Sequence, residues 1–151
     1  MKLNDLKIAI CSDHAGFELK ESLIAKLEVG ELKDFGCYTA DSCDYPDYAH
    51  PMALAVERKE FDFGIAICGT GNGVNITLNK HQGIRAALCW KTEIATLVRA
   101  HNDANVIVLP GRFVSKAEGY EMVKLFLTTG FEGGRHQPRI DKIPLVNEWT
   151  S

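Results

Sequence analysis

Residues 63–73 read FGIAICGTGNG, and this stretch decides the fold class of the chain. The apolar run at 63–68 is continuous rather than alternating, which is typical of a strand buried on both faces of a parallel sheet. The three glycines that follow let the backbone turn sharply and approach a ligand closely before a helix begins. This strand–turn–helix unit indicates an α/β protein.

Apolar runs and helical patterns alternate along the rest of the chain in the same way. Strands are predicted at residues 6–11, 32–35, 63–68, 85–89 and 106–109. Helices are predicted at 17–27, at 48–57 with Pro51 in the first turn, from the glycine turn to about residue 80, around 94–98, and at 115–128. The five strand–helix alternations predict a five-stranded parallel sheet with helices on both faces.

Length and composition fit one globular domain. The chain has 151 residues, of which 46% are hydrophobic and 25% charged, enough to bury a sizeable core. We expect residues 1–151 to form a single domain. Its last segment, 132–151, begins with glycines and an arginine and shows no strand pattern, so we expect it to reach away from the core.

Charge, hydropathy and cysteine usage exclude several classes of protein. The formal net charge of −3 provides no large positive field for nucleic acid. No apolar run approaches the ~20 residues of a membrane span, and the opening MKLND lacks the apolar stretch of a secretory signal. Five cysteines without a Cys-x-x-Cys pair indicate reduced thiols rather than disulfides or a zinc site. We expect a cytoplasmic protein that binds neither nucleic acid nor membrane.

Polar residues directly follow three of the predicted strands. The segments 12–14 (Ser-Asp-His), 69–71 (Gly-Thr-Gly) and 110–112 (Pro-Gly-Arg) should meet at the carboxyl edge of the sheet, where α/β proteins bind ligands. Cys68 ends the middle strand, and amide groups at the start of the next helix favour a thiolate there. A buried thiol in a tight turn is the alternative for Cys68, and a simple helix cap is the alternative for Asp13.

The glycine loop at 68–73 matches none of the better-known loops. A nucleotide P-loop needs Gly-Lys-Ser/Thr, but Gly73 is followed by Val74 and Asn75. A phosphatase of the Cys-x5-Arg type needs arginine where this chain has Val74. The Gly-x-Gly-x-Gly spacing also differs from the dinucleotide-binding motif. The loop therefore indicates ligand binding without transfer of a phosphoryl group.

One histidine and three arginines are further candidates. His101 falls on the apolar face of the helix around 94–98, so it is either a satisfied core residue or a catalytic group. It also precedes a strand, at the far end of the sheet from Cys68, so a neighbouring subunit would have to supply it. Isolated arginines are usually solvated, although a planar guanidinium suits phosphate well. The candidates for binding phosphate as a local trio are Arg112, Arg135 and Arg139.

Taken together, the motifs resemble a known family: ribose-5-phosphate isomerase type B and the related galactose-6-phosphate isomerase subunits. Each motif is weak alone, but seven in register over most of the chain are specific. They are SDHAG at 12–16, DYPDY at 44–48, CGTG at 68–71, NK at 79–80, GIRA at 83–86, HNDAN at 101–105 and EGGRH at 132–136.

The resemblance implies a Rossmann-like, three-layer α/β/α sandwich that forms a homodimer or a dimer of dimers. Active sites would lie between subunits, with 132–151 reaching to a partner, and would act on a phosphorylated sugar without metal or organic cofactor. Cys68 would be the base, His101 the ring-opening acid and Thr70 a further catalytic residue. The substrate-binding residues that the resemblance implies are Asp13, His14, Gly69, Gly71, Asn72, Gly73 and Asn102, with Arg112, Arg135 and Arg139 on the phosphate.

Aldose–ketose isomerisation fits these residue types, because it needs a base, an acid and donors for an oxyanion. The leading hypothesis is interconversion of ribose 5-phosphate and ribulose 5-phosphate. The same chemistry on allose or galactose 6-phosphate stays open, because Asn72, Asn75 and Pro138 depart from the usual family pattern. A non-catalytic sugar-phosphate sensor is the third hypothesis, although a sensor would need neither Cys68 nor His101.

Overall fold

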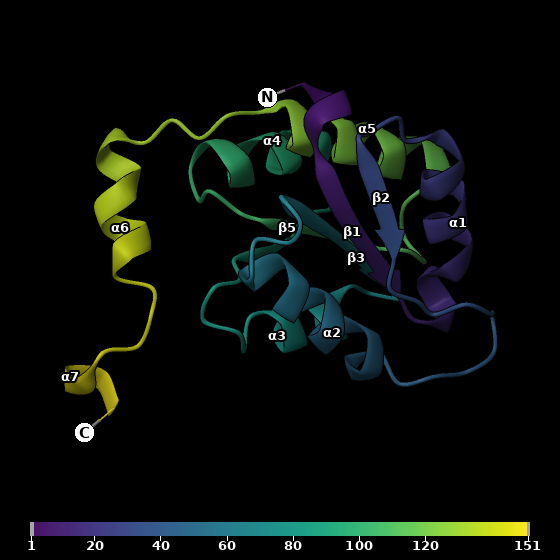
Figure 1. The fold of residues 1–151 in the computed structure, drawn as a ribbon, viewed down its shortest axis with the longest axis horizontal. Helices are drawn as coiled ribbons and strands as arrows, with labels where there is room; N and C mark the ends of the chain where they lie inside the picture. Colours follow the sequence, from purple (N-terminus) through teal and green to yellow (C-terminus); the bar gives the residue numbers. More distant parts are fainter. Residues whose placement is uncertain (1, 151) are drawn as a thin grey trace.

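The computed structural model describes residues 2–150 and contains a five-stranded sheet, shown in Figure 1. All strand pairs are parallel, in the order β2-β1-β3-β5-β4. The predicted parallel sheet is therefore confirmed. The strands are β1 (Lys7–Ser12), β2 (Glu31–Asp34), β3 (Phe63–Cys68), β4 (Ala86–Leu88) and β5 (Val106–Pro110).

Helices cover both faces of the sheet, which confirms the three-layer sandwich (Figure 1). In β1, Ile8 and Ile10 pack on the side of α1, α4 and α5, whereas Ala9 and Cys11 pack on the side of α2 and α3. This alternation explains the continuous apolar runs, since both faces of each central strand are buried. The helices are α1 (Phe17–Lys26), α2 (Pro46–Glu57), α3 (Asn72–Leu78), α4 (Thr92–Ala100), α5 (Lys116–Thr128), α6 (Gln137–Asp141) and α7 (Asn147–Thr150).

Two expectations about helices need correction. Helix α2 begins at Pro46, so Pro51 lies in its second turn rather than its first. In the first turn of a helix the backbone N–H groups have no acceptor within the helix, so the missing N–H of Pro46 costs no hydrogen bond there. The helix can therefore begin at Pro46, two residues before the predicted start. Two of the three apolar residues that marked α4 do not face the core: Ile94 is 40% exposed and Leu97 42% exposed, whereas Val98 packs against it. The buried residues of α4 are instead Ala95, Arg99 and Ala100.

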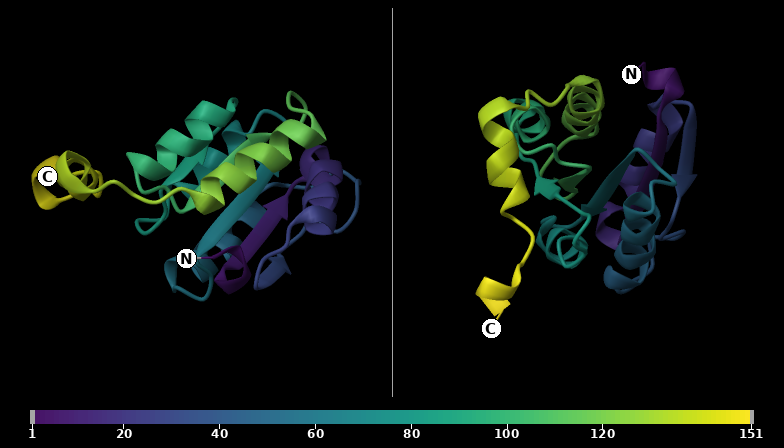
Figure 2. Two further views of the ribbon diagram at one scale, coloured as in Figure 1. Left: turned by 90° about the horizontal axis from the view of Figure 1, so that it is seen from above. Right: turned by 60° about the vertical axis from the view of Figure 1, so that its left-hand side comes forward.

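The C-terminal segment leaves the body of the protein after α5 (Figures 1 and 2). Its start is attached to the end of α4, because the amide of Glu132 donates to the carbonyl of Ala100 at 3.0 Å. Beyond this point α6 and α7 lie to one side of the sandwich, with Trp149 in α7 well exposed. None of the helices described in residues 2–150 is long and apolar enough to cross a membrane.

Candidate active site

Backbone hydrogen bonds join the three predicted site segments at the carboxyl edge of the sheet. The amide of Asp13 donates to the carbonyl of Ile67 at 3.1 Å, and the amide of Gly111 to that of Cys68 at 2.9 Å. The amide of Arg112 donates to the carbonyl of Gly69 at 3.1 Å. The convergence predicted from the strand ends is therefore observed.

Cys68 ends β3, is only 4% exposed, and belongs to the face of the sheet that α2 and α3 cover. After it, Gly71 adopts φ +82°, and a Cβ there would lie 2.4 Å from Leu88 Cδ1, so no other residue fits without rearrangement. In the described part of the chain, the amides of Gly69, Thr70 and Gly71 donate to no protein acceptor. Three unpaired donors thus follow the thiol directly, a group of donors that can bind an oxyanion.

Thr70 and Asn72 shape the same loop. The Thr70 side chain is exposed, and its Oγ1 accepts from the backbone amide and from Nδ2 of Asn72, each at 3.3 Å. Asn72 is also exposed and begins α3. Both side chains can therefore reach a ligand that lies on the loop.

A hollow of about 530 Å³ opens beside this loop, and we call it the carboxyl-end hollow. Asp13 Oδ1 accepts from the amide of Gly16 at 3.0 Å, so the capping role considered for Asp13 is real and fixes the carboxylate at the rim. His14 Nδ1 accepts from the amide of Cys43 at 3.3 Å, which leaves the ring proton on Nε2. The lining residues are Asp13, His14, Ala15, Cys43, Asp44, Tyr45, Pro46, Asp47, Gly69 and Arg112.

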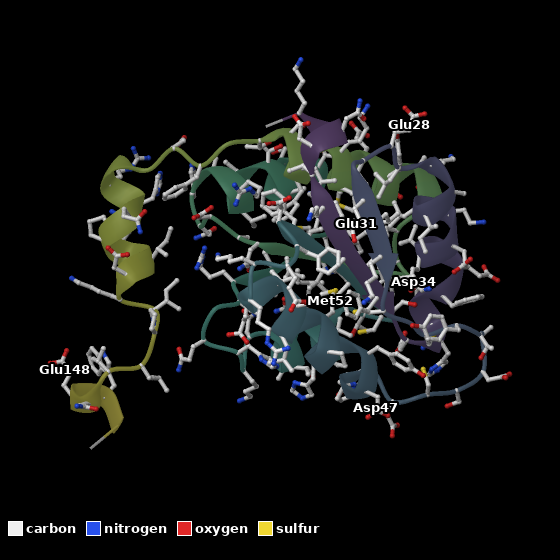
Figure 3. The ribbon with its side chains drawn as sticks, in the orientation of Figure 1. Glu28, Glu31, Asp34, Asp47, Met52 and Glu148 are labelled. Atoms are coloured by element: carbon white, nitrogen blue, oxygen red, sulfur yellow. The ribbon has the colours of Figure 1, made fainter. Side chains whose placement is uncertain are left out.

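The sequence assigned no site role to residues 43–47, although they form a large part of this wall. Tyr45 packs so closely on the glycine loop that a Cβ at Gly73 would lie 2.5 Å from the tyrosine Cζ. Asp47, labelled in Figure 3, follows at the start of α2. One feature of the sequence could have indicated a site role for these residues. They form a polar stretch after β2 and lead into α2, which covers the same face of the sheet as Cys68.

A second, smaller hollow of about 350 Å³ lies at the other end of the sheet, and we call it the amino-end hollow. His101 is the C-cap of α4 and its side chain is 37% exposed, so it is not a core residue. Its ring stacks on His136, with centroids 4.4 Å apart and an interplanar angle of 17°. The lining residues are His101, Asn102, His136, Arg139, Ile140 and Ile143.

His136 is a residue that sequence reasoning missed. Burial lowers the pKa of His136, and the neighbouring His101 ring and Arg135 guanidinium lower it further, against the opposing effect of Glu132. The Nε2 atoms of His101 and of His136 each lie 3.7 Å from Glu132 Oε2. Only the fold brings these three side chains together, because the two histidines are far apart in the sequence.

The two hollows lie at opposite ends of β5. Cys68 pairs with Pro110 at the last residue of the strand, whereas His101 precedes the first, Val106. The four residue steps of β5 span about 13 Å at ~3.3 Å each. Within one subunit the thiol and His101 are therefore apart, as their positions in the sequence predicted.

The three arginines do not form a trio within one subunit. Arg112 lies over Gly69 in the carboxyl-end hollow, where a Cβ on that glycine would be 3.4 Å from the arginine Cδ. Arg139 lines the amino-end hollow, and Arg135 is exposed just before α6. The sheet separates them because Arg112 follows the end of β5 and the other two belong to the C-terminal segment.

The family model described as Ribose/Galactose Isomerase matches residues 8–143. The chain belongs to this family. It is 44% identical to the Escherichia coli protein named ribose-5-phosphate isomerase B, over 94% of this chain and 97% of that one. The resemblance seen in the seven motifs, and the expectation of an isomerase, are thereby confirmed.

Solved structures of isomerases agree with the fold. The ribose 5-phosphate isomerase of Thermotoga maritima superimposes with a TM-score of 0.91 at 49% identity, covering 93% of this chain and 99% of that one. The Mycoplasma genitalium ribose-5-phosphate isomerase B, solved with bound ribulose-5-phosphate, gives a TM-score of 0.85 at 45% identity, covering 91% and 93%. The Rossmann-like sandwich is thus the fold of this family.

Proposed function

We propose that the chain interconverts ribose 5-phosphate and ribulose 5-phosphate in a site that two subunits share. The observation that carries the proposal is the division of chemical groups between the two hollows. The carboxyl-end hollow adjoins a thiol and free amides, and the amino-end hollow holds a histidine and a cation. Family membership and the relative with bound ribulose-5-phosphate support this substrate.

In the proposed reaction, His101 donates a proton to the ring oxygen as its bond to carbon 1 breaks, and the anomeric hydroxyl loses its proton to water. Cys68, as thiolate, removes the proton from carbon 2 of the open aldose and returns it to carbon 1 of the enediolate, while the hydroxyl proton on oxygen 2 passes to oxygen 1. The amides of Gly69–Gly71 and the hydroxyl of Thr70 hydrogen-bond to the oxygen on which charge develops. No step needs a metal, because the backbone N–H groups stabilise the negative charge that a Lewis acid would otherwise stabilise.

The remaining residues bind the substrate in this proposal. Asp13, His14, Asn72, Gly73 and Asn102 contact its hydroxyl groups. The guanidinium groups bind the phosphate, and each charge-assisted contact contributes about 1.5–3 kcal/mol. The phosphate-binding residues are Arg112, Arg135 and Arg139.

Exposed apolar side chains support the pairing of subunits. Scattered exposed apolar residues are ordinary, but several lie on α3, α4 and the C-terminal segment, and apolar surface can mark an interface. A two-fold homodimer, alone or paired into a tetramer, would create two equivalent shared sites and let 132–151 reach the partner. The exposed apolar residues of these three elements include Ile76, Ile94, Leu97, Ile143, Leu145, Val146 and Trp149.

Conversion of a panel of aldose phosphates, followed by NMR with excess chelator, tests the proposal. Ribose 5-phosphate should reach equilibrium with ribulose 5-phosphate, while free ribose should react very poorly. Conversion of allose or galactose 6-phosphate instead would move the function to six-carbon sugars. Binding without any conversion would identify a sensor.

All five cysteines are free thiols, so we also propose a reducing, cytoplasmic location.

A further inference from the structure

Two groups of two histidines and one glutamate occur in residues 2–150. The first consists of His50 and Glu57 in α2 with His81 beside them, and the second of His101, Glu132 and His136 in and beside the amino-end hollow. Their composition is identical, and imidazole with carboxylate is a common ligand set for zinc. Their geometry decides whether either can bind an ion.

The first group is a chain of hydrogen bonds. His50 Nδ1 lies 2.7 Å from His81 Nε2, and His81 Nδ1 lies 3.0 Å from Glu57 Oε1. Both ring nitrogens of His81 are thus occupied by neighbours on opposite sides of the ring. Unlike the second group, these three side chains do not bring three ligand atoms within 4.8 Å of one another.

The second group converges on one point. The Nε2 atoms of His101 and His136 each lie 3.7 Å from Glu132 Oε2, too far for a hydrogen bond, and the three ligand atoms all lie within 4.8 Å of one another. His136 is 8% exposed, and its buried Nε2 has no hydrogen-bond partner. A buried unpartnered nitrogen is unfavourable, and a ligand would relieve it.

We propose that His101, Glu132 and His136 bind one divalent transition-metal ion of the Zn²⁺ type, and that this ion inhibits the enzyme. The inhibition rests on the proposed function, because a metal ion on Nε2 of His101 prevents that nitrogen from carrying a proton to the sugar ring. The site supplies three protein ligands and leaves a fourth position for water.

Two of the three distances between ligand atoms are close to those that zinc requires, and the third is no longer than 4.8 Å. Bonds of about 2.1 Å in tetrahedral geometry place ligand atoms about 3.4 Å apart. The two observed nitrogen–oxygen separations of 3.7 Å need to shorten by only a few tenths of an ångström. The two rings are stacked, so one of them must also rotate until the Nε2 lone pairs of both histidines point at the same ion. His101 can make this rotation because its side chain is 37% exposed.

The surrounding charge makes Glu132 decisive. Arg139 lines the same hollow, and Arg135 precedes His136. The positive charge of both arginines disfavours binding of a metal cation. The carboxylate is the only negative group among the three ligands. Glu132→Gln keeps the shape of this half-exposed side chain and removes its charge, so it tests binding without disturbing the core.

Titration calorimetry with Zn²⁺ on the metal-free full chain tests the site without substrate. Glu132→Gln and His136→Gln should each weaken binding at least about tenfold, by analogy with the 10- to 100-fold losses seen for weaker metal-site changes. His50→Gln, in the chain-like group, should bind as wild type does. Equal binding by wild type and both ligand variants, or no binding by wild type, overturns the site.

Two further readouts separate the parts of the proposal. Co²⁺ in place of Zn²⁺ should show no thiolate charge-transfer band, since no cysteine belongs to the site; such a band would place the ion on a cysteine instead. Zn²⁺ should inhibit isomerisation at the concentrations that fill the site, and chelator should restore it. Full activity with the site filled would overturn the inhibition, whereas an inactive protein that still binds Zn²⁺ would overturn the proposed function alone.

Discussion

The two hollows differ in how the fold holds them. The carboxyl-end hollow is built on β1, β3 and β5, whose ends are tied by backbone hydrogen bonds such as that from Asp13 to Ile67. The amino-end hollow combines the end of α4 with a segment that has left the body of the protein. The glycine loop thus has a rigid support, whereas His101 and Arg139 meet only where the C-terminal segment passes.

This difference is the basis for the proposal that two subunits share one active site. The length of β5 separates Cys68 from His101, so neither hollow contains both the proposed base and the proposed acid. A segment that projects from one subunit can complete a site on another (Figure 2; Glu148 of α7 is labelled far from the sheet in Figure 3). The following experiments test this comparison.

The largest effect should come from Cys68→Ser in the carboxyl-end hollow. Serine keeps the size of the side chain but is too weakly acidic to supply an anionic base at neutral pH. We expect isomerisation to fall by about 10²- to 10⁴-fold with the fold unchanged. Proton–deuterium exchange at carbon 2 of the substrate is the measurement, and exchange at the wild-type rate would remove Cys68 from the mechanism.

Mixing two inactive variants tests whether the hollows belong to different subunits. Cys68→Ser and His101→Ala should form mixed dimers with one intact and one doubly damaged site. Random exchange makes about half of the dimers mixed, so roughly a quarter of the wild-type activity should return. The assay needs conditions in which ring opening limits the rate. Proven subunit exchange without recovery would contradict a shared site.

A smaller loss should follow from Arg139→Ala in the amino-end hollow. Removing one charge-assisted phosphate contact should raise KM about ten- to a hundred-fold, with a smaller effect on kcat. Arg58→Ala is the matched control, since Arg58 is an exposed arginine at the end of α2 that lines neither hollow. Identical kinetics for both variants would show that the C-terminal segment does not anchor the substrate.

The smallest effect is expected for two buried cysteines, which should not react with an alkylating agent. Burial raises the pKa of Cys89 to about 12 and raises that of Cys11 as well. At pH 8 only about 10⁻⁴ of the Cys89 thiol is ionised, and the thiolate is the reactive form. Iodoacetamide should therefore leave both residues unlabelled in the folded protein, as mass spectrometry can show. Labelling in denaturant is the control, and rapid labelling of the native protein would contradict this burial.

Much of the fold could be predicted because it depends on local pattern. Continuous apolar runs locate the strands within one or two residues, since both faces of β1 and β3 are buried. The inward face of α4 could not be read in this way. Its apolar stripe at Ile94 and Leu97 is exposed, while Arg99 is buried beneath the rings of Phe63 and Phe126. Periodicity shows that a face is apolar but not what covers it.

By itself, the sequence determined the parallel sheet, the loop after Cys68 and the family, because these depend on residues that are neighbours in the chain. Only the tertiary structure decided which distant side chains meet. It placed Tyr45 on Gly73, separated Arg112 from Arg139, and brought Glu132 and His136 to His101. Such meetings depend on crossover connections and on the path of the C-terminal segment, which no local spacing of residues encodes.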